Sequence, residues 1–389
     1  MNKNQIKILV APNSFKECAD SVEIATLIRA SFDQDIPPKI KKNIDFTYKP
    51  ISDGGDGFLE VCKNFFGLET LHFEISKPYG DEKFFAQAGY SPSTKTVYIE
   101  SAEVLGLRTI PQEYRKPLIL TSKGMGEILL QLIDNAETGF LEIKEVIIGI
   151  GGTGTNDLGL GMMEVFGLEL YDKDDNQLEV FPQNYNLVEK IVVPEVTLPF
   201  KLSIISDVKN PLLGKKGSAH VFASQKGAEK EEIKILEQGF INILKQLEID
   251  ENEIPNLPGA GGGLSAGLKL FFNATEVDST DFIMNRILDI ENNHTYDLVI
   301  TGEGKYDSQS LMDKGATIIT NEFIQKGIPV YFLCGITEGM LPEEEDMSVI
   351  DLSEYFDSIE ESIKNIEKGI DLACRRIVKD IVSLVSNKK

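Results

Sequence analysis

The residues with the clearest chemical potential lie at 149–157, a stretch of glycines and threonines that ends in an amide and a carboxylate. A β-branched run at residues 146–150 predicts a buried strand before it, and the apolar spacing of residues 156–166 predicts a helix after it. Between the two, small side chains leave backbone N–H groups uncovered where the helix dipole begins. This geometry binds phosphate or carboxylate, so we expect an anion site here.

The same stretch permits two other interpretations. Gly149, Gly151 and Gly154 match the glycine fingerprint of dinucleotide sites, with Glu169 or Asp172 at a tolerable distance to bind a ribose. The amide and carboxylate that follow the glycines favour a phosphate with its metal over a bare pyrophosphate. A tight turn whose glycines serve only packing is the structural alternative.

A second candidate site is the loop that follows the predicted strand at residues 45–51. It places Asp53 and Asp56 among three glycines. Glycines let a backbone approach a ligand closely, and either carboxylate is available there as a general base or a magnesium ligand. The alternatives are a plain turn and a weak calcium site, although the remaining ligands of an EF-hand are missing.

Hydroxyl and ammonium groups occur in a third loop, after the predicted strand at residues 6–10. Ser14 and Lys16 lie in this loop. Because ligands of α/β sheets bind at the carboxyl ends of strands, both residues are positioned to contact a substrate. A solvated surface lysine is the alternative for Lys16. Similar small-residue loops occur at residues 121–127, 257–267 and 302–310.

The composition indicates a globular protein. The chain has 389 residues, enough for two ordinary domains, and 42% of them are apolar. Its net charge of −23 argues against nucleic acid and anionic membranes as partners, so an anionic ligand requires local lysines and backbone amides. The four cysteines form no metal motif, and no apolar run has the length of a signal or membrane segment. We therefore expect a reduced, cytoplasmic protein.

The elements that must position these loops alternate between strand and helix, which predicts an α/β fold. The loops described above follow short apolar runs, as expected of strands in a buried parallel sheet. The predicted strands that deliver them lie at residues 6–10, 45–51, 146–150, 200–206, 296–301 and 330–334.

Taken together, the motifs resemble those of the bacterial glycerate kinases of the first class, in the same order and over nearly the whole chain. The motifs are PNSFK from Pro12, DGGDG from Asp53, TSxGxGE from Thr121, GGTGTND from Gly151, DxxNPL from Asp207, QKGA from Gln225, PGAG from Pro258 and TGEGxxDxQS from Thr301. The chain departs from the family pattern at Asn13, where aspartate is usual, and at Asp56, where glutamate is usual.

The resemblance implies two α/β domains with the active site in the cleft between them. One is discontinuous and Rossmann- or flavodoxin-like, at residues 1–66 plus 285–389, and the other is inserted at residues 67–284. The resemblance also implies transfer of the γ-phosphoryl group of ATP, with Mg²⁺, to D-glycerate. For this class it favours 2-phosphoglycerate over 3-phosphoglycerate as the product.

Phosphoryl transfer needs a phosphate cradle, a metal, cations and a base, and the chain supplies candidates for each. No Walker A pattern is present, so we assign the cradle to glycine loops: Gly151, Gly152, Thr153, Gly154, Thr155, Asn156, Gly261 and Gly262. The candidate magnesium ligands are Asp157, Glu303 and Asp307. The candidate substrate-binding residues are Ser14, Lys16, Lys226, Gln309 and Ser310. The predicted catalytic residues are Asp53 as the base, Asp207 as its rival and Lys16.

Two other function classes stay open from the sequence. A dehydrogenase of a small hydroxy acid would use the dinucleotide fingerprint for NAD, and a non-catalytic metabolite-binding protein would keep the loops without turnover. Neither explains why carboxylates and lysines accompany so many separate glycine loops. We expect a small-molecule substrate, neither nucleic acid nor membrane as partner, and a monomer or homodimer.

Overall fold

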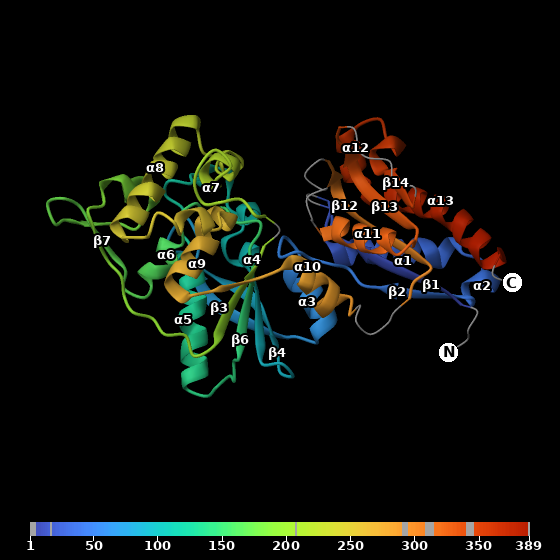
Figure 1. Cartoon of the computed structure of the whole chain (residues 1–389), viewed down its shortest axis with the longest axis horizontal. Helices are drawn as coiled ribbons and strands as arrows, with labels where there is room; N and C mark the ends of the chain where they lie inside the picture. The colour runs from blue at the N-terminus through green and yellow to red at the C-terminus, as the bar shows by residue number, and fades with distance from the viewer. Residues whose placement is uncertain are drawn as a thin grey trace. The chain divides into compact units, whose positions relative to one another are not determined.

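The computed structural model describes residues 5–15, 18–206, 208–289, 295–307, 315–339 and 346–387. Two compact α/β units make up the chain (Figure 1). Unit 1 comprises Met1–Phe65 and Asp278–Lys389, and unit 2 comprises Phe66–Val277. Residues 278–284, predicted to end the inserted domain, thus belong to unit 1, where the rings of Phe282 and Phe58 lie 5.6 Å apart.

The sheet of unit 1 contains five parallel strands in the order β14-β13-β12-β1-β2. These are β1 (Ile6–Pro12), β2 (Ile44–Tyr48), β12 (Leu298–Tyr306), β13 (Val330–Thr337) and β14 (Met347–Asp351). The chain runs outward from β1 to β2 on one side and from β12 to β14 on the other, so the topological switch point lies between β1 and β12. Ligands of doubly wound sheets bind outside the carboxyl ends of the strands at this point.

Helices cover both faces of this sheet, and alternating side chains of β13 show why. Leu333 joins an apolar core with α1 and α13, whereas Phe332 and Cys334 pack with Ala316 of α11. Successive strand residues point to opposite faces, so a buried strand must be apolar on both. The helices are α1 (Ser21–Asp35), α2 (Pro38–Lys41), α3 (Phe58–Phe66), α10 (Ser279–Asp281), α11 (Gly315–Gln325), α12 (Ile359–Lys364) and α13 (Ile366–Asn387).

Unit 2 contains a mixed sheet in the order β11-β10-β6-β5-β4-β3. Its strands are β3 (Glu69–Ser76), β4 (Lys83–Ser91), β5 (Thr96–Glu100), β6 (Glu145–Gly149), β10 (Lys201–Ile205) and β11 (Thr275–Val277). Strands β5, β6, β10 and β11 are parallel, whereas β3 and β4 form an antiparallel edge. The loops after β5 and β6 therefore leave the same edge of the sheet.

One large apolar core supports unit 2, and its strand residues, among them Val97, Ile99, Val146 and Ile148, lie on one face of the sheet. Its helices are α4 (Ser101–Leu105), α5 (Lys123–Glu137), α6 (Leu160–Glu164), α7 (Ser218–Phe222), α8 (Lys230–Gln246) and α9 (Leu264–Phe272). A small antiparallel sheet is formed by β7 (Glu169–Tyr171), β8 (Gln177–Leu178) and β9 (Lys190–Val192). Across the described part of both units, no helix is long and apolar enough to cross a membrane.

Candidate functional site

The glycine loop after β6, residues 150–157, is held against the start of α4. The hydroxyl of Ser101 accepts a hydrogen bond from the Gly151 N–H (3.1 Å) and donates one to the Gly151 carbonyl (3.0 Å). The Gly154 N–H donates to the carbonyl of Leu105 (2.7 Å). Gly152, with φ of 64°, is exposed. Part of the loop backbone is thus used within the protein, and part faces outward.

The helix predicted at residues 156–166 begins later and is much shorter. Leu158 and Gly159 adopt left-handed backbone conformations, with φ of 57° and 72°, so α6 begins only at Leu160 and has five residues. The prediction that the glycine loop runs directly into a helix N-terminus is therefore wrong. Any anion bound by this loop must be held by loop amides and side chains rather than by a helix dipole.

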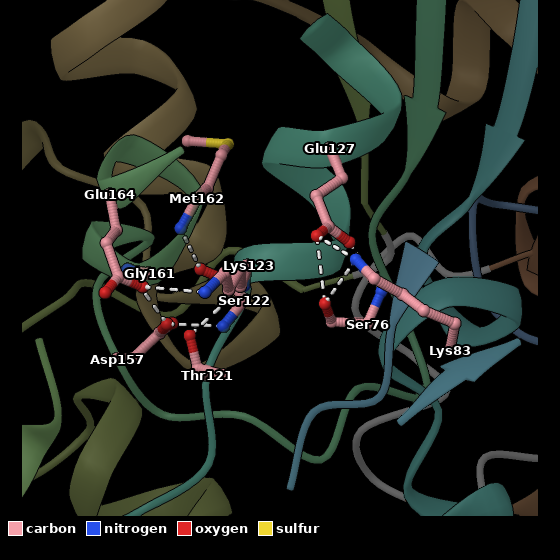
Figure 2. Close-up of polar contacts among 10 residues, drawn as sticks. All are labelled: Ser76, Lys83, Thr121, Ser122, Lys123, Glu127, Asp157, Gly161, Met162 and Glu164. Atoms are coloured by element: carbon pink, nitrogen blue, oxygen red, sulfur yellow. Dashed lines mark hydrogen bonds and ion pairs between the residues drawn. The ribbon is translucent and has the colours of Figure 1, made fainter. Parts of the chain in front are cut away.

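Asp157 explains this geometry, because its carboxylate occupies the start of α6. The side chain is fully buried, and Oδ2 accepts hydrogen bonds from the N–H groups of Ser122 (2.6 Å) and Gly161 (3.3 Å) (Figure 2). Its Oδ1 accepts from the Gly159 N–H (3.2 Å). Burial raises the pKa of Asp157, and these hydrogen bonds partly oppose the shift. The protein backbone already uses both oxygens, which favours a structural role for Asp157 over the predicted role as a magnesium ligand.

Two further side chains fix the end of the same loop. The hydroxyl of Ser122 accepts a hydrogen bond from the Met162 N–H (2.9 Å), which ties α5 to α6 (Figure 2). The hydroxyl of Tyr185, from the 3₁₀ turn Pro182–Leu187, donates to the carbonyl of Asp157 (3.0 Å). The loop is therefore clamped from at least three elements of unit 2.

Lys226 lies directly against the loop. It ends the 3₁₀ turn Ser224–Lys226, and only 3% of it is exposed. Its ammonium donates to the Thr155 carbonyl (2.8 Å) and to the Thr153 hydroxyl (3.3 Å). Burial lowers the pKa of Lys226 to about 7, against the opposing field of Asp157. The structure thus brings Lys226 to the predicted phosphate loop.

The second predicted glycine loop, Ala260–Gly263, packs against the first. Gly261, Gly262 and Gly263 all have left-handed backbones, with φ of 65°, 72° and 86°. The carbonyl of Gly262 accepts the Leu158 N–H (3.3 Å), and a Cβ at Gly262 would clash with the Thr155 carbonyl and with Oδ1 of Asn156. Glycine is needed here for the close approach of two backbones.

Buried polar atoms without partners lie between these two loops. The hydroxyl of Thr155 and both amide atoms of Asn156 are buried and find no hydrogen-bond partner among the described residues. Buried polar groups are nearly always paired, so such atoms indicate a group that completes the site. The loop at 150–157, Lys226 and the loop at 260–263 together make up what we call the phosphate-loop cluster.

A second cluster forms in unit 1, at the carboxyl ends of its strands. The amide nitrogen of Asn13, after β1, donates to Oδ2 of Asp53, after β2 (3.3 Å). The Asn13 Oδ1 accepts the Ser14 N–H (2.8 Å), and its backbone N–H donates to the Gly302 carbonyl on β12 (2.8 Å). Three chain segments therefore meet beside the topological switch point, and we call this the Asn13–Asp53 cluster.

The first residue of α11 completes this cluster. A Cβ at Gly315 would clash with Nδ2 of Asn13 and would lie 2.9 Å from Oδ2 of Asp53. The N-terminus of an eleven-residue helix therefore lies beside a carboxylate that is only 7% exposed. Glu303 is the residue after Gly302 on β12 and pairs with Cys334 of β13.

The three predicted magnesium ligands are divided between the two units. No group of three Asp, Glu, His or Cys side chains with metal-binding geometry occurs among the described residues. Asp157 belongs to unit 2, whereas Glu303 and Asp307 belong to unit 1. Glu303 and Asp307 are four residues apart along an extended strand, roughly 13 Å, and Asp307 pairs with the Lys305 ammonium (3.1 Å). The described residues of unit 1 therefore offer two separated carboxylates as candidate magnesium ligands, rather than a cluster of ligands around one ion.

Four predicted site residues lie outside the described residues and stay predictions: Lys16, Asp207, Gln309 and Ser310. Conversely, the sequence analysis assigned no role to Asn13, Ser101 or Tyr185. Ser101 directly follows residues 96–100, TVYIE, whose β-branched and aromatic composition is typical of a strand, so its position was a usable signal. Tyr185 carries no comparable signal, because its contact with the loop depends on tertiary packing.

Comparison with known proteins is consistent with this architecture. The model of the glycerate kinase family matches residues 8–382. A glycerate kinase of Neisseria meningitidis serogroup B is 31% identical, over 92% of this chain and 94% of that protein. The glycerate 2-kinase of Escherichia coli K12 is 32% identical, over 96% of this chain and 97% of that protein. A crystal structure described as a glycerate kinase 2 from Salmonella typhimurium LT2 matches with a TM-score of 0.73 and 28% identity, over 97% of this chain and 98% of that one. The chain belongs to the glycerate kinase family.

Proposed function

We propose that this protein transfers the γ-phosphoryl group of ATP to D-glycerate, and that 2-phosphoglycerate is the favoured product. The observation that carries the proposal is the phosphate-loop cluster, where a buried lysine and orphaned polar atoms accompany two closely packed glycine loops. Membership of the glycerate kinase family supports the reaction, and the Escherichia coli relative is named as a 2-kinase.

Phosphoryl transfer asks the protein mainly for positioning and electrostatic stabilisation. In our proposal the phosphate-loop cluster holds the nucleotide phosphates through the loop amides other than those of Gly151 and Gly154, which bond within the protein, together with the side chains of Thr155 and Asn156 and the glycines at 261 and 262. The net charge of −23 repels an anionic ligand, so this local arrangement must supply the attraction.

Asp53 is the proposed general base, which removes the proton from the attacking hydroxyl of glycerate. It is buried at the carboxyl end of the unit 1 sheet, and the Asn13 amide orients its Oδ2 (3.3 Å). Asp207 stays the rival base. Ser14, Lys16, Gln309 and Ser310 are the proposed contacts to the substrate, with Lys16 also a candidate to stabilise the migrating phosphoryl group.

Magnesium fits the residues of unit 1 in a limited way. Mg²⁺ is commonly bound by one or two protein carboxylates, with substrate phosphates and water supplying the other ligands. Glu303, beside the switch point, suits this role, and Asp307 is the second candidate. An ion held there would neutralise part of the phosphate charge.

The geometry does not favour the dehydrogenase alternative. In a dinucleotide site the glycine turn opens directly into a helix whose N-terminus binds the pyrophosphate. Here two left-handed residues and the Asp157 carboxylate separate the glycines from a five-residue helix.

A coupled ADP-release assay with ATP and magnesium across a panel of small hydroxy acids tests the proposal. We expect D-glycerate to be turned over with the highest kcat/KM, and phosphorus NMR of the product to show phosphate at carbon 2. Failure to release ADP with any hydroxy acid would refute kinase activity. A product phosphorylated at carbon 3 would refute only the regiochemistry.

A further inference from the structure

Lys226 is a buried cation whose described contacts are neutral. Its hydrogen bonds go to a carbonyl oxygen and a hydroxyl, those of Thr155 and Thr153, and none of the ion pairs between described residues includes it. Taking an ammonium out of water without a counter-ion is costly, so such a group favours either loss of its proton or the arrival of an anion.

Among the residues that the structure describes, the charged groups around Lys226 do not remove this cost. Asp157 acts on Lys226 through its electrostatic field and makes no direct contact with it. The oxygens of Asp157 accept hydrogen bonds from three backbone N–H groups. The Arg115 carbonyl packs against Gly227, while the Arg115 guanidinium donates to the carbonyl of Ile110 (3.0 Å). The loop at 260–263 carries no titratable side chain. The remaining titratable residues on the adjoining helices α7 and α8 nearest to Lys226 are exposed: His220, Glu229 and Lys230.

Both protonation states of Lys226 fit the observed geometry. A neutral amine still has two N–H donors, which is the number of hydrogen bonds that Lys226 makes to the loop. The protonated form adds a positive charge beside the orphaned amide of Asn156 and hydroxyl of Thr155. A phosphate oxygen would satisfy those donors and stabilise the charge.

We infer that the 150–157 loop binds the phosphate of a nucleoside di- or triphosphate together with a proton, and that Lys226 takes up this proton. The inference rests on the proposed function in one respect, the assignment of this loop to nucleotide phosphates. It assigns Lys226 to the nucleotide phosphate rather than to the carboxylate of glycerate.

Proton uptake by Lys226 and nucleotide binding are linked, and the direction of the pH effect follows from the protonation of Lys226 in the free protein. Burial lowers the pKa of Lys226 in the free protein to about 7, so at pH 8 most molecules carry the neutral amine. An anion beside it raises the pKa, and the proton comes from solvent. At pH 8 the uptake then approaches roughly 0.9 proton per nucleotide bound, and affinity falls as pH rises above 7, by up to about tenfold per unit.

Isothermal titration calorimetry of the full-length protein with MgADP tests this inference. Titrations at pH 8 in two buffers of different ionisation enthalpy give the number of protons taken up, and titrations from pH 6.5 to 9 give the pH dependence of Kd. We expect uptake approaching about 0.9 proton in the wild type and near zero in Lys226→Met, with Kd raised at least tenfold in the variant at pH 7. Proton release by the nucleotide itself cancels in the comparison between the two proteins.

Lys49→Met is the matched control. Lys49 lies in unit 1, donates to two backbone carbonyls, those of Ile287 (2.9 Å) and Leu288 (2.8 Å), and burial lowers its pKa as well. This variant should keep the wild-type proton uptake. Equal proton uptake in Lys226→Met and wild type would overturn the inference. A wild-type Kd that does not change from pH 7 to 9 would also overturn it, and that measurement does not depend on how well the variant folds. If the wild-type protein neither binds MgADP nor turns over D-glycerate, the proposed function is refuted instead.

Discussion

Asp53 and Asp157 are both buried carboxylates that follow a strand, yet their surroundings suit them to different tasks. Asp157 accepts three backbone N–H groups and joins α5 to α6, which is a structural use. Asp53 lies at the carboxyl edge of a parallel sheet, beside its switch point, where ligands of this fold bind. Residue type and spacing are similar in the two loops, so only the contacts distinguish them.

Asp53→Asn tests the role of base. The amide keeps the size of the side chain and removes the proton acceptor, so we expect kcat to fall by about 10²-fold or more. Asp56→Asn, in the same glycine loop, is the matched control and should stay within about tenfold of wild type. A kcat for Asp53→Asn that stays within about tenfold would transfer the role to another residue, with Asp207 as the first candidate.

Asp157→Asn tests the structural role. The single amide oxygen cannot accept all three N–H groups, so we expect the free energy of unfolding to fall by about 2 kcal/mol, measured by urea denaturation. The magnesium concentration for half-maximal activity should not change. Glu164→Gln, at the end of α6, removes a surface pair with Lys123 (3.8 Å) and should change stability by less than about 1 kcal/mol. A large rise in the magnesium requirement of Asp157→Asn would restore it as a metal ligand.

At the scale of elements, two glycine loops pack so closely that side chains are excluded. Gly262→Ala adds a Cβ that clashes with the Thr155 carbonyl and the Asn156 side chain, so we expect KM for ATP to rise at least tenfold. Gly139→Ala has the same left-handed backbone, with φ of 73°, but nothing lies within 4 Å of its Cβ. Both substitutions cost about 1–2 kcal/mol of backbone strain, and only Gly262→Ala should change KM. Equal KM values in the two variants would show that the loop contact has no role in nucleotide binding.

At the scale of the whole molecule, the buried Lys226 makes stability depend on pH. In the unfolded chain its pKa is about 10.4, whereas burial lowers the pKa to about 7 in the folded protein. Between these values the unfolded state binds more protons, so the contribution of Lys226 to stability rises with pH by up to about 1.4 kcal/mol per unit. The free energy of unfolding of the wild type, relative to that of Lys226→Met, should therefore rise from pH 7.5 to 9.5 in urea unfolding without nucleotide. A difference that does not vary with pH would contradict the lowered pKa.

Unit 2 provides a second test at this scale. Its large apolar core draws only on residues within Phe66–Val277, and every contact of the phosphate-loop cluster described above lies in the same range. We expect the fragment 66–277 to fold by itself, with a cooperative thermal transition in circular dichroism and dispersed amide resonances in NMR. A fragment that is unfolded at 25 °C would show that unit 2 depends on unit 1.

The amino-acid sequence by itself determined the α/β class, most strand positions and the loops that carry chemistry, because apolar runs and glycine clusters are local signals. Three features depended on tertiary structure. Left-handed residues at 158 and 159 shorten the helix after the glycine loop, backbone N–H groups from two helices take the Asp157 carboxylate, and burial places Lys226 against Thr155. The sequence identifies a carboxylate at Asp157 and an ammonium at Lys226, but it does not identify the groups that they contact. Their partners come from segments 35 and 71 residues away, so the fold alone decides whether they bind a ligand or the protein itself.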